Sequence, residues 1–176
     1  MTPRLELSAD SPEETRGVGR AVASVLGAGD VVSLTGDLGA GKTTFVQGAA
    51  AELGIEQPVL SPTFTLVHEY QATHPVFHLD VYRLDRLQEV LDLGFEEMLD
   101  RGGVMFIEWG DVIEALLPES YLQVELSLRD DEEERRDITV SGQGRSWAER
   151  WDRLAEAMSR WERLVDLPRR EERGPG

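Results

Sequence analysis

Residues 36–43 read Gly-Asp-Leu-Gly-Ala-Gly-Lys-Thr, and this stretch decides the fold that we expect. It matches the phosphate-binding loop in which a glycine is followed by four residues and then by Gly, Lys and Ser or Thr. The apolar segment 30–35 before the loop is typical of a buried strand, and a helix is expected from about residue 41 to residue 53. A strand, a glycine-rich turn and a helix in this order are the context that such a loop requires. The stretch therefore predicts a nucleotide-phosphate site.

Each residue type in this loop suits the binding of phosphate. The glycines allow backbone N–H groups to turn inward, and the N-terminus of the helix adds partial positive charge. Lys42 is expected to reach the β- and γ-phosphates, and the hydroxyl of Thr43 to ligate Mg²⁺. An ordinary glycine-rich turn before a helix is the alternative. The loop residues predicted to contact the nucleotide are Gly36, Asp37, Leu38, Gly39, Ala40, Gly41, Lys42, Thr43 and Thr44.

Lys42 stands out in the composition as well. It is the only lysine among 18 basic residues, so every other basic side chain is an arginine. Arginine is used wherever a generic cation would serve, and the exception indicates a site that requires a compact ammonium group. An ordinary turn offers no reason for this placement, and we therefore favour the phosphate-binding interpretation.

Composition excludes several other classes of protein. The chain of 176 residues has no cysteine, which excludes a disulfide framework, a cysteine-ligated metal and a thiol nucleophile. Its net charge of −16 argues against broad binding of nucleic acid by the chain alone. We find no signal peptide and no apolar stretch that suits a membrane span, so we expect a cytoplasmic protein. Asparagine is also absent, which removes the Asn-Lys-x-Asp element of guanine recognition and favours adenine.

Charge divides the chain into two expected parts. Residues 1–144 hold 10 basic and 27 acidic side chains, whereas residues 145–176 hold 8 and 7. We interpret the first part as the domain that carries the phosphate-binding loop and the second as a C-terminal helical tail. Within the first part, the charged run at 129–136 is expected to be a solvated turn between two strands, with an acidic docking patch as the alternative.

The tail is predicted to form an amphipathic helix. Its large apolar side chains recur at alternating steps of four and three residues, which places them on one face. A terminal helix docked on the body is the simpler interpretation, and a helix that binds a partner is the alternative. The apolar stripe consists of Trp147, Trp151, Leu154, Met158, Trp161 and Val165.

The order of the remaining patterns predicts an α/β fold. Strands alternate with helices early in the chain, and adjacent strands follow in its middle and late parts. We therefore expect a three-layer sandwich like that of P-loop nucleoside triphosphatases, with a mixed, mainly parallel sheet and the C-terminal amphipathic helix. Helices are expected at 11–26, 41–53 and 87–101, the last with a break near Gly94, and strands at 30–35, 64–70, 76–82, 104–107, 121–128 and 137–140.

Two carboxylates follow candidate buried strands. Asp80 ends one such strand and Glu108 follows another, and acidic side chains at this edge of a sheet would face the phosphates. We predict that both are functional, as a second Mg²⁺ anchor and in orienting the attacking water; a cap or an ion pair is the alternative. Thr63 is a candidate sensor of the γ-phosphate, although a simple transition from loop to strand explains it equally well. His78 is interpreted as a structural residue.

Several ordered motifs together make the sequence similar to a known family. They are Gly-Asp-Leu-Gly-Ala-Gly-Lys-Thr-Thr at 36–44, Ser-Pro-Thr-Phe-Thr-Leu-Val at 61–67, His-Leu-Asp-Val-Tyr-Arg-Leu at 78–84, Leu-Gly-Phe-Glu-Glu at 93–97 and Ile-Glu-Trp-Gly at 107–110. Over roughly residues 5–140 this pattern resembles the bacterial ATPase family TsaE. The resemblance implies a small ATPase required for making N6-threonylcarbamoyladenosine at position 37 of tRNA.

The resemblance also implies partners. The family binds the TsaD–TsaB complex, whose TsaD subunit transfers the threonylcarbamoyl group, and its ATP binding and slow hydrolysis reset that complex between turnovers. ATP and Mg²⁺ are thus the implied ligands, TsaD and TsaB the implied partners, and tRNA is reached only through them, with no membrane involved. A P-loop small-molecule kinase is the alternative, although the sequence shows no arginine-rich lid. An interaction module that nucleotide merely stabilises is a third possibility.

Position by position, the resemblance implies roles for individual residues. Lys42 cradles phosphate, Thr43 and Glu108 ligate Mg²⁺, and Asp80 serves hydrolysis. The predicted catalytic residues are therefore Lys42, Asp80 and Glu108. Further nucleotide contacts are implied for Glu13, Thr15, Trp109 and a late arginine, which we take as Arg135, with Arg136 as the alternative because the acidic run leaves the alignment ambiguous.

Overall fold

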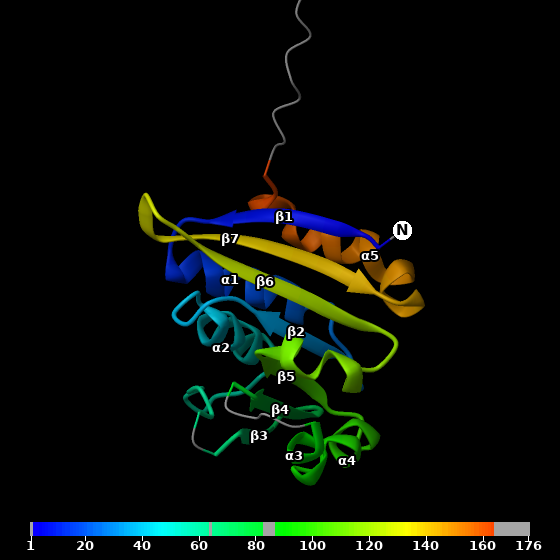
Figure 1. The fold of residues 1–176 in the computed structure, drawn as a ribbon. Coiled ribbons are helices and arrows are strands. Elements are labelled where there is room, and N and C mark those ends of the chain that lie inside the picture. The colour runs from blue at the N-terminus through cyan, green and yellow to red at the C-terminus, as the bar shows by residue number, and fades with distance from the viewer. Residues whose placement is uncertain (1, 64, 83–86, 164–176) are drawn as a thin grey trace, which may run out of the picture.

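The computed structural model describes residues 2–63, 65–82 and 87–163. Its centre is one seven-stranded sheet in the order β1-β7-β6-β2-β5-β4-β3, which runs from the top of Figure 1 to the bottom. Helices lie on both faces of this sheet, so the expected three-layer α/β sandwich is confirmed. The strands are β1 (Arg4–Ala9), β2 (Val31–Thr35), β3 (Val67–Gln71), β4 (Pro75–Asp80), β5 (Val104–Glu108), β6 (Tyr121–Arg129) and β7 (Glu132–Gln143).

The sheet is mixed, and its parallel part lies at the centre. β6, β2, β5 and β4 are parallel neighbours, whereas β7 and β1 at one edge and β3 at the other join in antiparallel fashion. Short runs that are buried on both faces, as in β2 and β5, are typical of central parallel strands. Because β4 and β5 run in the same direction and in register, Asp80 lies directly beside Glu108 at their carboxyl ends.

Two hydrophobic clusters fill the space between the sheet and the helices. One face of the sheet packs against α1 (Pro12–Ala23), α2 (Lys42–Glu52) and α5 (Arg145–Met158). The opposite face packs against α3 (Leu87–Asp92), α4 (Phe95–Asp100) and the 3₁₀ helix η1 (Gly110–Leu116). Alternation along the strands supplies both clusters, since Phe106 belongs to the first and Ile107 to the second.

Helices α1 and α2 approach each other at two glycines. A Cβ atom on Gly19 would lie 2.2 Å from the carbonyl oxygen of Phe45, and one on Gly48 would lie 2.0 Å from that of Arg16. Glycine is therefore required here by the lack of space and not by backbone angle. This contact fixes α2, whose first residue is Lys42, against the body of the protein.

The C-terminal helix α5 docks on the body, as its apolar stripe predicts. Trp147, Leu154 and Met158 are buried in the same cluster as α1 and α2, while Trp151 and Trp161 are partly buried against it. Arg150 adds a bidentate pair with Asp30, at 2.7 and 2.8 Å, and stacks on the ring of Trp147. The helix is followed by the short 3₁₀ turn η2 (Ser159–Trp161), and the last residue of the stripe, Val165, lies outside the described residues.

Two predicted strands are shorter than expected. The strand expected at 64–70 begins only at Val67, because the chain turns at Leu66, which has φ 66° and donates its N–H to the carbonyl oxygen of Pro62. Phe64 itself lies outside the described residues. The strand expected at 76–82 ends at Asp80, whose side chain accepts the N–H of Tyr82.

The predicted turn at 129–136 is wrong in its extent. β6 continues to Arg129 and β7 begins at Glu132, so the turn is confined to residues 130 and 131 and the rest of the charged run lies in the two strands of a long hairpin. Strand β1 was not expected, because its partner β7 lies far away in the sequence. The helix expected at 87–101 is broken at Gly94, as predicted, into α3 and α4, and Gly94 has φ 84°. Within the described residues, no helix combines the length and the apolar character that crossing a membrane requires.

Candidate nucleotide-binding site

A glycine-rich loop (residues 36–41) joins β2 to α2 and forms one wall of the largest pocket described here. Gly36, Gly39 and Gly41 have φ values of 143°, 80° and 104°, a region that side chains disfavour. Gly41 is the N-cap of α2, and no side chain among the described residues hydrogen-bonds to that cap. The N–H groups of the first turn of α2 are therefore available to an anion.

Lys42 follows this loop and is only 5% exposed. Its ammonium donates to the carbonyl oxygens of Gly36 and Asp37, at 2.6 and 3.0 Å, and lies 4.1 Å from the centre of the Trp109 ring. Burial lowers the pKa of Lys42 from its ordinary value, while the nearby carboxylates, Glu108 foremost, oppose that shift. The arrangement holds a desolvated cation at the mouth of the loop.

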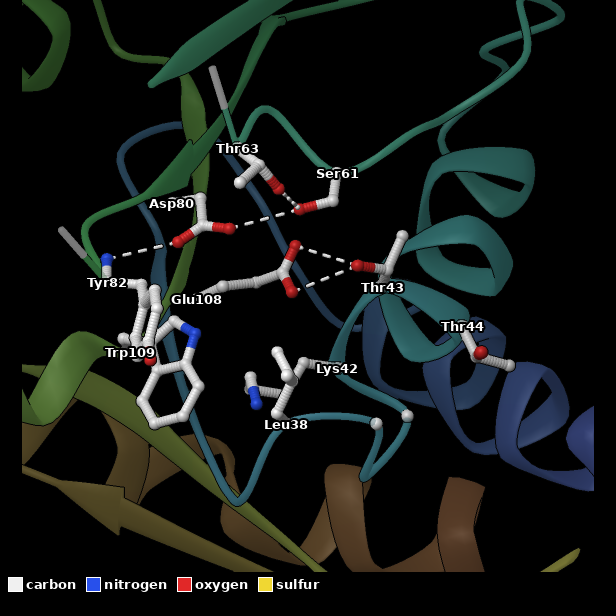
Figure 2. A pocket seen from close by; sticks show the side chains of 12 residues that line it. Leu38, Lys42, Thr43, Thr44, Ser61, Thr63, Asp80, Tyr82, Glu108 and Trp109 are labelled. Atoms are coloured by element: carbon white, nitrogen blue, oxygen red, sulfur yellow. Dashed lines mark hydrogen bonds between the residues drawn. The ribbon is translucent and has the colours of Figure 1, made fainter. Parts of the chain in front are cut away.

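Glu108 and Thr43 form the second feature of the pocket. The Thr43 hydroxyl, at the start of α2, donates to both carboxylate oxygens of Glu108, each at 3.0 Å. Figure 2 shows the two side chains pointing toward each other across the pocket. Glu108 is buried at the end of β5 and has a further contact with His78. A hydroxyl and a carboxylate in contact are hard oxygen donors of the kind that Mg²⁺ prefers.

Asp80 forms the third feature, with a pair of hydroxyl groups. Its Oδ2 accepts from the hydroxyl of Ser61 at 3.0 Å, and Ser61 lies 3.1 Å from the hydroxyl of Thr63. Its Oδ1 accepts the N–H of Tyr82 at 3.1 Å. These bonds fix the carboxylate at the end of β4 with its face toward the pocket (Figure 2).

The pocket has a volume of about 400 Å³ and brings most of the predicted site residues together. One side of its mouth is aromatic, because the rings of Tyr82 and Trp109 lie 4.7 Å apart. Leu38 and Tyr82 are large apolar side chains that stay 77% and 52% exposed beside it. The lining residues are Leu38, Gly39, Gly41, Lys42, Thr43, Thr44, Ser61, Thr63, Asp80, Tyr82, Glu108 and Trp109.

Ser61 and Tyr82 contribute to this pocket, although neither is among the predicted site residues. Both flank a residue that was selected: Ser61 is two positions before Thr63, and Tyr82 is two positions after Asp80. The sequence motifs at 61–67 and 78–84, which contain these two residues, were the signal by which they could have been predicted. The contact of Ser61 with Asp80 depends on how the loop before β3 lies against the end of β4, whereas the contact of Tyr82 with Asp80 is local.

A smaller hollow lies on the other side of the loop. It is lined by Pro12, Thr15, Gly41, Thr44, Glu134 and Arg136. Thr15 is buried, and its hydroxyl has no hydrogen-bond partner among the described residues. A nucleotide bound along the loop would bring polar groups to this side, which suits the predicted role of Thr15.

Of the two candidate arginines, Arg136 reaches the loop. Its guanidinium donates to the carbonyl oxygens of Ala40 at 2.9 Å and Gly39 at 3.4 Å. Arg135, which we took as the candidate, instead contacts Ser8, Asp10 and Glu132. Neighbouring residues on a strand point to opposite faces, so the register of β7 brings only one of them to the loop.

Glu13 does not lie at the pocket. Its exposed carboxylate pairs with Arg16 one turn later on α1. The hydroxyl of Ser11, the N-cap of α1, accepts the N–H of the neighbouring Glu14, and the Glu14 carboxylate accepts the N–H of Asp10, the residue before the cap. Glu13 and Glu14, the acidic pair before Thr15, thus make their contacts at the start of α1.

The family model described as "Threonylcarbamoyl adenosine biosynthesis protein TsaE" matches residues 9–138 of the chain. The chain belongs to the TsaE family. The match includes the glycine-rich loop, Asp80 and Glu108, and it ends before α5. This confirms the resemblance and connects the chain with the biosynthesis of tRNA threonylcarbamoyladenosine.

Individual TsaE proteins are similar over most of their length. The tRNA threonylcarbamoyladenosine biosynthesis protein TsaE of Bacillus subtilis is 41% identical over 155 residues, which cover 88% of this chain and 93% of the relative. That of Treponema pallidum is 43% identical over 131 residues, covering 74% and 96%. The crystal structure of YdiB from Bacillus subtilis has a TM-score of 0.74 and 37% identity, and the match covers 91% of this chain and 97% of that one.

The residues of the pocket fit a magnesium ion that is shared with a nucleotide. The described residues contain no group of three or more His, Cys, Asp or Glu side chains that would hold a metal alone. Mg²⁺ commonly takes one or two protein ligands and completes its shell with phosphate oxygens and water. Thr43 and Glu108, in contact beside the loop, suit that mode of binding.

Proposed function

We propose that this protein binds ATP with Mg²⁺ and hydrolyses it slowly, and that it uses this cycle to act on the TsaD–TsaB complex in tRNA threonylcarbamoyladenosine biosynthesis. The observation that carries the proposal is the contact between the Thr43 hydroxyl and both oxygens of Glu108, next to the buried ammonium of Lys42. The N–H groups of the loop and the Lys42 ammonium can bind the phosphates of a nucleoside triphosphate. The oxygen donors of Thr43 and Glu108 can bind its metal ion.

Each group has a separate task in this proposal. The N–H groups of the loop and the Lys42 ammonium bind phosphate oxygens, and Thr43 and Glu108 hold the metal. Mg²⁺ supplies charge neutralisation at the phosphates when it is bound. Asp80, fixed by Ser61 and Tyr82, orients the attacking water and accepts its proton. The absence of asparagine from the chain favours adenine over guanine.

Two features support a protein partner in preference to direct contact with tRNA. The net charge of −16 repels a polyphosphate backbone. The exposed Leu38 and Tyr82 at the mouth of the pocket offer apolar contacts to another protein surface. Together they support the proposal that the protein reaches tRNA through TsaD and TsaB. A cytoplasmic location is part of the same proposal.

The test is the release of phosphate from ATP in the presence of Mg²⁺, with and without TsaD–TsaB. We expect slow release by the chain alone and faster release with the complex. Asp80→Asn keeps an oxygen for the N–H of Tyr82 but loses the base, so hydrolysis should fall by about 10²–10⁴-fold while ATP binding persists. Asp100→Asn, at an exposed acid that ends α4, is the matched control and should stay near wild type.

Three results would count against the proposal. Turnover that ignores the added complex would contradict the action on TsaD–TsaB. Transfer of the γ-phosphate to a small acceptor instead of water would favour the kinase alternative. Full hydrolysis by Asp80→Asn would remove Asp80 from the chemistry.

A further inference from the structure

Glu108 has a buried partner besides Thr43. His78 lies on β4, is fully buried, and places its Nε2 atom 2.5 Å from Oε2 of Glu108. Burial of a polar side chain is costly unless it is hydrogen-bonded, and the contact of the imidazole with the Glu108 carboxylate satisfies this condition at Nε2. The contact joins the interior of the sheet to the pocket.

The topology explains why these two side chains meet. β4 and β5 are parallel neighbours, with His78 in register with Phe106 and Asp80 in register with Glu108. Side chains two apart share a face, so His78 and Asp80 lie on the same face as Glu108. His78 lies two residues before Asp80 on β4, so it approaches the Glu108 carboxylate from the interior of the sheet.

The direction of the hydrogen bond follows from its acceptor. An ionised carboxylate only accepts, so Nε2 of His78 carries the hydrogen. Nδ1 has no hydrogen-bond partner among the described residues. A hydrogen on Nδ1 would therefore be a buried donor without a partner, whereas the hydrogen on Nε2 is bonded to Glu108.

Thr43 alone does not distinguish the two oxygens of Glu108. Its hydroxyl lies 3.0 Å from each of them. The imidazole of His78 bonds only to Oε2, which leaves Thr43 as the sole hydrogen-bond partner of Oε1 among the described residues. A donor on one oxygen fixes the rotation of the carboxylate, as the outer partners of metal ligands commonly do.

We propose that His78 is a positioning residue: its Nε2–H holds the Glu108 carboxylate in the orientation in which that carboxylate and Thr43 together bind Mg²⁺. The proposal rests on the proposed function, in which Glu108 is a magnesium ligand. It replaces the structural role that the sequence suggested for His78. His78 touches neither the loop nor Lys42 in the described contacts, so its effect should be confined to the metal.

Two substitutions separate positioning from simple packing. His78→Gln can place an amide N–H near the position of Nε2, whereas His78→Asn places its amide near Nδ1 and cannot reach Glu108. We would measure ADP affinity by calorimetry, in EDTA and over a range of Mg²⁺ concentrations. His78→Asn should raise the Mg²⁺ concentration needed for tighter binding by about 10–100-fold, with His78→Gln closer to wild type. Affinity in EDTA should be the same for all three proteins.

The possible outcomes distinguish the positioning role of His78 from the magnesium site on which that role rests. A His78→Asn protein that responds to Mg²⁺ as wild type does would overturn the positioning role alone. Wild-type ADP affinity that is indifferent to Mg²⁺ would overturn both the positioning role and the magnesium site. Equal impairment of Gln and Asn variants in EDTA would show a packing role and would also overturn the proposal.

A measurement on the unsubstituted protein covers the case in which His78→Asn fails to fold. The chain has three histidines, so ¹⁵N NMR of their rings is readily resolved and assigned. We expect His78 to be the Nε2–H tautomer, with ring signals that shift when Mg²⁺ is added to the ADP-bound protein. A hydrogen on Nδ1, or ring signals that Mg²⁺ leaves unchanged, would contradict the proposal.

Discussion

At the scale of single residues, Lys42 shows how a costly placement indicates a binding role. Its ammonium is buried among two carbonyl oxygens and the Trp109 ring, and burial lowers its pKa in spite of the surrounding carboxylates. Burying a cation contributes less to folding than an apolar side chain of the same length would. The burial of the Lys42 ammonium is thus better explained by the binding of a ligand than by a contribution to folding stability.

Lys42→Met tests this explanation. Methionine keeps the aliphatic stem and buries no charge, so we expect an unchanged or higher midpoint of thermal unfolding. ATP affinity should fall by about tenfold to a hundredfold, because hydrogen bonds from a charged donor are lost. Calorimetry and thermal unfolding measure the two quantities, and Arg145→Met, at an exposed cation, is the control. A variant that binds ATP normally would exclude Lys42 from the site.

The sequence predicted the pocket best where spacing along one element determines the contact. Lys42 and Thr43 follow the loop directly, and Asp80 and Glu108 end neighbouring strands, so their meeting was foreseeable. The choice between Arg135 and Arg136 was not, because it depends on the register of a hairpin. The contact between His78 and Glu108 depends on which strands are neighbours, and no local pattern encodes that order.

At the scale of elements, the hairpin of β6 and β7 contacts the glycine-rich loop through one side chain. Arg136→Ala removes the hydrogen bonds to Gly39 and Ala40, so we expect the loop to be less fixed and ATP affinity to fall by about threefold to tenfold. Arg135→Ala is a matched control, since it removes the same charge but leaves the loop contacts in place. Equal losses in the two variants would attribute the effect to charge alone.

The packing of α1 on α2 gives a second prediction at this scale. Gly48→Ala would place a Cβ atom against the carbonyl of Arg16, and we expect the free energy of unfolding to drop by about 1–3 kcal/mol. Gly27→Ala is the control, because a Cβ atom at Gly27 meets nothing within 4 Å. Denaturant unfolding measures both. If Gly48→Ala were as stable as Gly27→Ala, the two helices would not be in close contact.

The elements themselves were predicted unequally, for physical reasons. The short apolar run before the loop and the periodic apolar stripe of α5 are strong signals, and both predicted the correct element. The composition of the charged run at 129–136 is that of a solvated loop, yet the chain turns at residues 130 and 131 and the rest of the run belongs to β6 and β7. Pairing across the sheet outweighed local preference there.

At the scale of the whole molecule, the net charge of −16 bears on the proposal that the protein reaches tRNA through a protein partner. We expect no binding of tRNA by the chain alone up to about 10 µM at physiological salt, because the phosphate backbone is repelled. The proposed binding to TsaD–TsaB should weaken as salt increases if the acidic surface contributes to it. Fluorescence anisotropy with labelled tRNA measures the first, and tight binding by the isolated chain would contradict the indirect role.

The central claim is that Thr43 and Glu108 hold the metal of a bound nucleotide beside Lys42. A crystal structure with a non-hydrolysable ATP analogue and Mn²⁺, located by its anomalous signal, tests it most directly. We predict one Mn²⁺ ligated by the Thr43 hydroxyl and the Glu108 carboxylate, with phosphate oxygens completing its shell and the Lys42 ammonium on the phosphates. A metal bound elsewhere, or phosphates outside the glycine-rich loop, would contradict the account.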